Sequence, residues 1–309
     1  MYSKSLKKKS FVSNRKLFNL LKIKKSECKF KKKKLVQKKI WKKNILEDWE
    51  FISSINETIP AYFLRPRGDG PFPTIIYCHA HGGTYDKGRV ELLKGRKSLL
   101  SDYGSFLSTK GFAVLCIEMP CFGSRQIPNE SSRSKSLSWY GKTLFGQMIS
   151  EQIAGVDFLV KNHFVEKNKI VSFGLSMGAT HSFWLAAIDR RINSSIHMCS
   201  FSDLATLIQT GAHNFHGHYM TVPGLLNNYT TAQIAGLIAP RPQLICVGLK
   251  DVLTRPKSFS KAKKDLISIY KKNSANKKLI FCIENKSGHR ETKKMRQKIS
   301  KFLDAYLCK

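Results

Sequence analysis

Short apolar runs recur along this chain, and longer stretches with helical periodicity separate them. The runs predict strands buried on both faces, because they lack the polar alternation of a half-solvated strand. They lie at residues 74–78, 112–117, 170–173, 193–198, 243–247 and 278–283. Helices are expected at residues 90–110, 139–162, directly after 176, 256–272 and near the C-terminus. Alternating strands and helices are typical of a parallel sheet covered by helices on both faces.

Two stretches depart from this alternation. Residues 48–64 hold two apolar segments on either side of the polar Asn56-Glu57-Thr58, which predicts an antiparallel strand pair. Residues 126–138 are polar and rich in serine, which predicts a loop. The expected fold class is therefore α/β, with a mostly parallel central sheet, helices on both faces and an antiparallel N-terminal strand pair. Residues 48–309 provide enough chain for one such domain.

Residues 1–47 differ in composition from the rest of the chain. They contain 18 Lys and Arg residues and two acidic residues, Glu27 and Glu47. Short apolar groups such as residues 17–21 interrupt the charge, but the continuous apolar stretch of a secretory signal is absent. We interpret residues 1–47 as a basic segment that is helical or flexible. Amphipathic helices packed partly on the domain are favoured over a flexible arm or a surface that contacts membrane or nucleic acid.

The 309 residues carry a formal net charge of +33, from 54 Lys and Arg against 21 Asp and Glu. Such a charge attracts anionic partners, so a weak interaction of residues 1–47 with nucleic acid or a membrane surface is one interpretation. The excess is mostly Lys, and biased amino-acid usage is the favoured explanation. Zinc-finger spacing and aromatic RNA-binding motifs are absent from the sequence. Because no apolar run reaches about 18 residues, no transmembrane helix is expected.

The eight cysteines include no C-x-x-C pair of the kind that binds metal or performs redox chemistry. Cys78, Cys116, Cys246 and Cys282 lie in predicted core strands, where they are expected to be small buried apolar residues. A chain without a disulfide framework fits a reducing compartment, so a cytoplasmic location is expected.

Lys169–Thr180 reads KIVSFGLSMGAT and combines an apolar strand, a glycine turn around Ser176 and the start of a helical pattern. This arrangement is the G-x-S-x-G nucleophile elbow in its expected context. Gly174 and Gly178 lack a Cβ, which lets strand and helix pass close to each other. The free N–H groups at the start of the helix favour negative charge beside Ser176. An ordinary glycine turn between a strand and a helix is the alternative.

A serine nucleophile needs a neighbouring base, and the base needs a group that orients it. Asp251 follows the predicted strand at 243–247, and His289 follows the last predicted strand at 278–283. Both lie past the carboxyl ends of strands, the edge at which open α/β sheets bind ligands. Taken singly, Asp251 fits an ordinary helix cap and His289 fits an ordinary loop residue. Together with Ser176 they predict a Ser-His-Asp triad in the chain order serine, acid, histidine.

An oxyanion hole requires two backbone N–H groups aimed at the developing negative charge. One is expected from Met177, the residue after the candidate nucleophile. The other is expected from His81 in the sequence HAHGG at residues 79–83, directly after the strand at 74–78. Gly82 and Gly83 allow a tight approach of this loop, for which a generic glycine turn is the alternative.

On these motifs the chain resembles the α/β-hydrolase superfamily, and within it the dienelactone-hydrolase-like and acetyl-xylan-esterase-like serine esterases. The resemblance spans about residues 48–307. It rests on the Ser176, Asp251 and His289 positions and on the sequences HAHGG, EMPCFGSR, GLSMG, GHYMTVPGLL and APRPQL. It implies an α/β-hydrolase fold and a carboxylesterase or acetylesterase that works through an acyl-enzyme, with no metal or organic cofactor. The implied substrate is a small-molecule ester.

Similar proteins place the GHYMTVPGLL sequence at the rim of the active site. The residues expected to line the substrate pocket are His79, Gly82, Gly83, His218 and Tyr219. The nearby histidines at 213, 216 and 218 are not expected to bind a metal, because no further ligand of suitable spacing joins them.

Two departures and two alternatives accompany the resemblance. Dienelactone hydrolases use a cysteine nucleophile, so Ser176 favours an esterase, and Cys121 stands where glycine is more usual. A peptidase or amidase uses the same triad. A non-catalytic binding protein would instead depend on the basic segment 1–47.

Overall fold

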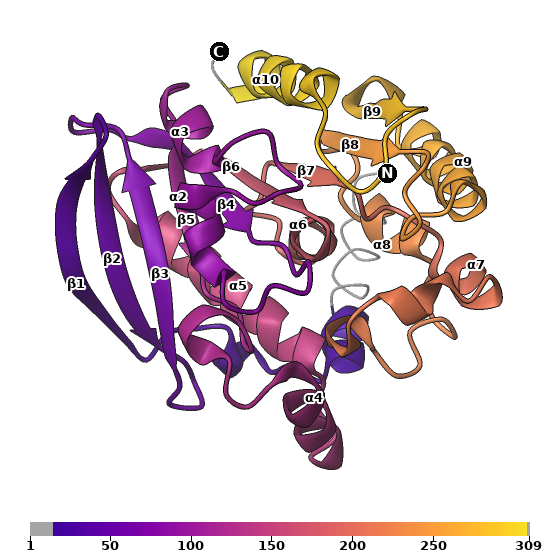
Figure 1. Ribbon diagram of the computed structural model, residues 1–309, viewed down its shortest axis with the longest axis horizontal. Helices are drawn as coiled ribbons and strands as arrows, with labels where there is room; N and C mark the ends of the chain where they lie inside the picture. The colour runs from indigo at the N-terminus through magenta and orange to yellow at the C-terminus, as the bar shows by residue number, and fades with distance from the viewer. Residues whose placement is uncertain (1–14, 308–309) are drawn as a thin grey trace, which may run out of the picture.

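The computed structural model of the chain describes residues 15–307, which form a nine-stranded sheet with helices on both faces (Figure 1). The strand order is β1-β2-β3-β5-β4-β6-β7-β8-β9. The strands are β1 Lys32–Trp41, β2 Asn44–Ile52, β3 Thr58–Arg65, β4 Phe72–Cys78, β5 Ala113–Ile117, β6 Val165–Leu175, β7 Ser194–Met198, β8 Gln243–Gly248 and β9 Leu279–Glu284. The pairs β1–β2, β2–β3 and β3–β5 are antiparallel. All the following pairs in this order, from β5–β4 to β8–β9, are parallel. The predicted fold class is confirmed.

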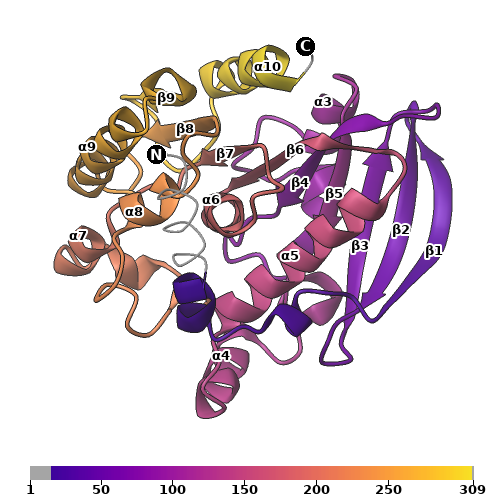
Figure 2. The same ribbon diagram turned by 180° about the vertical axis from the view of Figure 1, so that it is seen from behind.

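Helices cover the two faces of the sheet, as the views from opposite sides show (Figures 1 and 2). They are α2 Glu91–Lys94, α3 Tyr103–Ser108, α4 Glu130–Trp139, α5 Leu144–Lys161, α6 Met177–Ile188, α7 Leu204–Gln209, α8 Thr231–Gly236, α9 Pro256–Lys272 and α10 Lys293–Leu307. One apolar core contains side chains of α5, α6, α8 and α9, and the other contains side chains of α2, α3 and α10. Strand β8 supplies both cores alternately, because neighbouring side chains of a strand point to opposite faces.

The helix expected at residues 90–110 is instead the two short helices α2 and α3. Helix α2 ends at Gly95, whose φ of +63° lies in the left-handed region. A Cβ at Gly95 would lie 3.1 Å from the backbone nitrogen of Asp102, so the chain turns tightly there. The break follows from this glycine, which the apolar periodicity on either side concealed.

The loop expected at residues 126–138 is wrong, because most of this stretch forms helix α4. Asn129 caps the helix, since its side chain accepts a hydrogen bond of 2.9 Å from the N–H of Ser132. Helix α4 is polar on nearly every side, so the sequence has no apolar stripe that would identify it as a helix. The next helix, α5, begins at Leu144 rather than at residue 139, because Thr143 caps it.

The second part of the basic segment is a strand rather than a helix. Strand β1 pairs antiparallel with β2, and the boundary expected after residue 47 falls inside β2. Nearly every residue of β1 is exposed. A strand solvated on both faces needs no apolar alternation, so its sequence of Lys and scattered apolar residues did not identify it. Pairing with β2 fixes its conformation.

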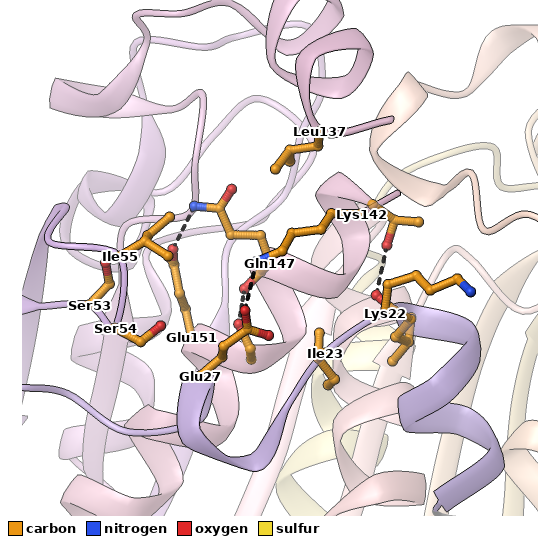
Figure 3. A pocket seen from close by; sticks show the side chains of 13 residues that line it. Lys22, Ile23, Glu27, Ser53, Ser54, Ile55, Leu137, Lys142, Gln147 and Glu151 are labelled. Carbon is orange, nitrogen blue, oxygen red and sulfur yellow. Dashed lines mark hydrogen bonds and ion pairs between the residues drawn. The ribbon is translucent and has the colours of Figure 1, made fainter. Parts of the chain in front are cut away.

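The first described residues pack against the domain. Residues 15–21 are helical, and Leu17 and Leu21 are fully buried. Lys142, just before α5, donates to the Glu27 carboxylate at 2.7 Å, as Figure 3 shows. A cavity of about 40 Å³ lies along this contact, which is room for a water molecule rather than a substrate. Residues 1–14 of the expected basic segment lie outside the described residues.

The state of the cysteines and the character of the helices bear on what the composition led us to expect. The seven cysteines between residues 15 and 307 are free and buried. Among the helices of the same residues, none combines the length and the apolar character needed to cross a membrane.

Three buried histidines make the stability of the fold depend on pH. Burial lowers the pKa values of His79, His181 and His197 to about 3, about 4 and about 4. In the unfolded chain these groups titrate near 6.5. Their neutral forms therefore contribute fully to the free energy of unfolding above about pH 6.5. This contribution is lost as the pH falls toward the pKa values of the folded state. Each histidine lowers the free energy of unfolding by roughly 1.4 kcal/mol per pH unit in that window.

We expect unfolding by urea to need less denaturant at about pH 5 than at about pH 7. The variant His197→Asn should show a smaller difference between the two conditions, because it removes one of the three groups. Equal pH dependence in the variant and the wild type would contradict the neutral state of His197. The variant's lower stability at neutral pH does not affect this comparison, which uses the difference between conditions.

Candidate active site

Ser176 lies at the turn between β6 and α6 and has a strained backbone. Its φ of +57° and ψ of −120° are unusual for a residue with a side chain. The turn is as tight as the motif predicts. A Cβ at Gly174 would collide with the backbone of Gly178, and a Cβ at Gly178 would collide with the carbonyl of Cys78. The two glycines thus allow α6 to start against the end of β4.

The three candidate triad residues lie in hydrogen-bonding order. Nε2 of His289 is 2.9 Å from Oγ of Ser176, and Nδ1 of His289 is 2.7 Å from Oδ2 of Asp251. The other oxygen of the buried Asp251 carboxylate accepts from the N–H of Leu253 at 2.9 Å. A carboxylate accepts only, so Nδ1 carries the proton that it shares with Asp251, and Nε2 is free to accept from Ser176. This arrangement can activate the serine hydroxyl.

The loops that carry Asp251 and His289 hold each other in place. The N–H of Lys250 donates to the carbonyl of Ser287 at 2.9 Å. At Gly248, a Cβ would collide with the same carbonyl. The close approach of the two loops, beyond the ends of β8 and β9, fixes the separation of the acid and the histidine.

The two expected oxyanion donors are available. Among the hydrogen bonds of residues 15–307, none uses the backbone N–H of His81 or of Met177. The neighbouring backbone of the His81 loop is held firmly. The N–H of Ala80 donates to the carboxylate of Glu91, and Arg96 donates to the carbonyl oxygens of Ala80 and His81 at 3.3 and 3.4 Å. Free donors on a fixed backbone can stabilise an oxyanion.

The residues expected in the substrate pocket have different surroundings. His79 is fully buried, with Nε2 accepting from the N–H of Met119 and Nδ1 next to the carbonyl of Ala80, so it is a core residue. Gly82 and Gly83 are exposed at the turn, with φ values of +56° and +66°. His218 is exposed and lines a cavity of about 560 Å³, whereas Tyr219 is buried, with its ring tilted against that of His81 at 5.8 Å between centroids.

That cavity lies over α7 and the irregular segment that follows it. Its wall combines histidine and asparagine side chains with apolar ones, including His213, His216, Met220 and Leu225. Nε2 of His216 donates a hydrogen bond of 3.1 Å to the carbonyl of Leu253, two residues after Asp251. The cavity wall is thus tied directly to the loop of the candidate acid.

Three side chains that carry possible metal-binding atoms meet beside Ser176. One nitrogen of His289, a carboxylate oxygen of Asp251 and Sγ of Cys199 lie within 4.8 Å of one another. The first two are already joined by the hydrogen bond described above. Burial raises the pKa of the Cys199 thiol well above its ordinary value, which keeps it protonated. The arrangement is that of a hydrogen-bonded triad with a neighbouring thiol.

Sequence reasoning missed three charged residues around the His81 loop. Glu91 and Arg96 form a buried ion pair beneath it, and Glu130 accepts a hydrogen bond from the His81 ring. Glu91 and Arg96 carried no motif, and Glu130 lay in the stretch expected to be a loop. Only the tertiary fold brings them to the site.

Comparison with known proteins places the chain among hydrolases. Residues 132–309 match Peptidase_S9, the prolyl oligopeptidase family. The chain belongs to this family. It is also 34% identical over 266 residues to "Putative hydrolase YtaP" of Bacillus subtilis (strain 168), over 85% of this chain and 89% of that protein. Membership of the α/β-hydrolase superfamily, which the sequence motifs predicted, is confirmed.

Solved structures share the fold at low identity. Methylesterase BT1017 superimposes with a TM-score of 0.76 and 17% identity, over 99% of this chain and 65% of that chain. The acetyl xylan esterase from Paenibacillus sp. R4 superimposes with a TM-score of 0.67 and 18% identity, over 92% and 91% of the two chains. These likenesses show that the α/β-hydrolase fold is retained although most residues differ.

The strain at Ser176 leads to a prediction about stability. We expect Ser176→Gly to be more stable to urea than Ser176→Ala by about 1 kcal/mol, because glycine adopts a positive φ without a steric penalty. Both variants lack the hydroxyl, so their difference isolates the backbone from the lost hydrogen bond. If Ser176→Ala is the more stable of the two, the turn is not strained in the folded protein.

Proposed function

We propose that this member of the prolyl oligopeptidase family is a serine esterase that cleaves a carboxylic ester of a small molecule. The observation that carries the proposal is the chain of two hydrogen bonds from Ser176 through His289 to Asp251, at 2.9 and 2.7 Å. The fold that it shares with an acetyl xylan esterase and a methylesterase supports an ester substrate.

The proposed reaction uses groups of the chain alone. Ser176 Oγ attacks the acyl carbon as its proton passes to Nε2 of His289, and Asp251 stabilises the resulting imidazolium. The backbone N–H groups of Met177 and His81 bind the oxyanion of the tetrahedral intermediate. The C–O bond then breaks, and His289 gives its proton to the leaving alcohol. Water repeats the sequence on the acyl-enzyme and regenerates the serine.

The cavity beside His218 is the proposed binding site for the substrate. Its mixed wall of imidazole, amide and apolar side chains fits a small ester with both polar and apolar parts. Gly82 and Gly83 are not among the residues that line this cavity. His79 is not part of the proposed binding site, because both of its ring nitrogens lie against backbone groups in the core.

An amide substrate is the second candidate, because the family is named for peptide hydrolysis. An ester and an amide need the same triad and differ in the leaving group that His289 must protonate. We also propose the cytoplasm as the compartment, on the ground of the free, buried cysteines.

The triad proposal is tested by hydrolysis of p-nitrophenyl acetate. We expect turnover by the wild type, and a fall of about 10⁴-fold or more in kcat for Ser176→Ala and for Asp251→Asn. Wild-type turnover in Ser176→Ala would contradict the proposal. Cleavage of aminoacyl p-nitroanilides but not of the ester, abolished by the same substitution, would replace the esterase with the amidase.

A weak anionic partner is proposed in addition, because β1 presents an exposed row of lysines at the edge of the sheet. The exposed lysines include residues 32, 34, 38 and 39. Deleting residues 1–47 would remove β1 and part of β2, so it would disturb the sheet. Point substitutions test the surface without that damage.

We expect the four substitutions Lys32→Gln, Lys34→Gln, Lys38→Gln and Lys39→Gln to weaken binding to anionic vesicles at low salt at least tenfold, since each lysine near a membrane contributes about 1 kcal/mol. The matched control replaces four exposed lysines of α9, namely Lys257, Lys264, Lys271 and Lys272, with Gln. Equal loss in both variants would show a response to net charge alone. Binding to RNA but not to vesicles would identify nucleic acid as the partner.

A further inference from the structure

Three segments that are far apart in the sequence meet at the buried carboxylate of Glu130, the first residue of α4. Its Oε2 accepts from Nε2 of His81 at 2.6 Å and from the hydroxyl of Tyr85 at 2.7 Å. Its Oε1 accepts from the backbone N–H of Tyr219 at 2.8 Å. The carboxylate therefore joins the His81 loop, α4 and the segment that borders the large cavity.

The hydrogen bonds fix the tautomer of the His81 ring. The backbone N–H of Gly83 donates to Nδ1 of His81 at 3.0 Å, so Nδ1 holds a lone pair. In the neutral ring the proton then lies on Nε2, where it faces Glu130. The ring is thus held at both nitrogens, by its own loop on one side and by α4 on the other.

Glu130 is ionised in this environment. Burial alone would raise its pKa, but the hydrogen bonds from His81 and Tyr85 outweigh burial and lower the pKa below the ordinary value. Hydrogen bonds to an ionised acceptor are shorter and roughly twice as strong as neutral ones. A neutral amide at this position could not accept from all three donors.

The backbone at residue 217 passes directly over this pair. A Cβ on Gly217 would lie 2.5 Å from Oε1 of Glu130 and 2.9 Å from Nε2 of His81. Gly217, His218 and Met220 line the cavity of about 560 Å³. Glu130 therefore contacts the His81 ring and lies against the backbone of Gly217 in one cavity wall.

We propose that Glu130 is a positioning residue of the active site, which holds the His81 loop in the orientation that presents its backbone N–H to the oxyanion. The inference rests on the proposed esterase function, because that N–H affects the rate only if it receives the oxyanion. The hydrogen bonds of Glu130 go to His81, Tyr85 and Tyr219 rather than to Ser176. It acts through the His81 ring.

The test is a double-mutant cycle with Glu130→Gln and His81→Phe, measured with p-nitrophenyl acetate. Loss of a whole oxyanion donor costs roughly 10²–10³ in rate, so a displaced donor should cost about 10–100-fold. We expect each single variant to lose this much in kcat while KM changes less than about threefold. The double variant should lose no more than the worse single variant, because the two side chains act as one unit. If the loss of kcat in the double variant is the product of the two single losses, the inference is overturned.

A second readout separates positioning from general damage. A trifluoromethyl ketone forms a hemiketal oxyanion with the serine, so its inhibition constant should rise in Glu130→Gln by the same factor by which kcat/KM falls. Unchanged inhibition with a reduced rate would contradict the proposed role. The matched control is Glu47→Gln, which removes another buried carboxylate, ion-paired with Arg65 on β2 and β3. It should leave kcat and inhibition unchanged, and an equal loss there would also overturn the inference.

Ser176→Ala distinguishes this failure from failure of the proposed function. If Ser176→Ala is inactive and Glu130→Gln behaves as the wild type, only the positioning role is wrong. If Ser176→Ala retains activity, the esterase mechanism itself is wrong. If Glu130→Gln does not fold, as thermal unfolding would reveal, His81→Phe alone tests the same link, and wild-type kcat in that variant would overturn it.

Discussion

The left-handed backbone of Ser176 exists because β6, α6 and the end of β4 touch without side chains between them. Gly174 and Gly178 leave no room for a Cβ against each other or against Cys78. Such a conformation costs on the order of 1–3 kcal/mol and persists only where its surroundings are rigid. The fully buried β6 end and α6 supply that rigidity. The strain has a chemical use, since it holds Oγ clear of the sheet and within reach of His289.

The rest of the site is held by contacts between backbone groups rather than by long side chains. The loops after β8 and β9 fit together at Gly248 and Ser287, which sets the distance between Asp251 and His289. On the other side of the serine, Glu91 accepts a hydrogen bond from the N–H of Ala80, and Arg96 donates to the carbonyl oxygens of Ala80 and His81. The N–H of His81 stays unused. A site with fixed, unpaired donors needs little reorganisation when charge develops, which is the main source of catalysis in reactions of this kind.

The parts of this structure that the sequence predicted correctly are those with local signals. The core strands had continuous apolar runs, and the elbow had two glycines at fixed spacing from Ser176. Asp251 and His289 could be placed because the carboxyl ends of parallel strands share one edge of the sheet. Strand β1 was missed because both of its faces are solvated, and α4 was missed because it has almost no apolar stripe. Gly95 divides an otherwise periodic stretch, and only its positive φ reveals the break.

The surroundings of His81 could not be predicted for a different reason. Its partner Glu130 lies 49 residues away and has no motif of its own. A buried carboxylate is stable only with several donors, and here the donors come from a ring, a phenol and a backbone amide on separate segments. Each segment therefore depends on the same charge. Since the His81 ring is engaged at both nitrogens, its side chain ties the loop to α4, and Gly217 of the cavity wall lies directly against the same hydrogen-bonded pair.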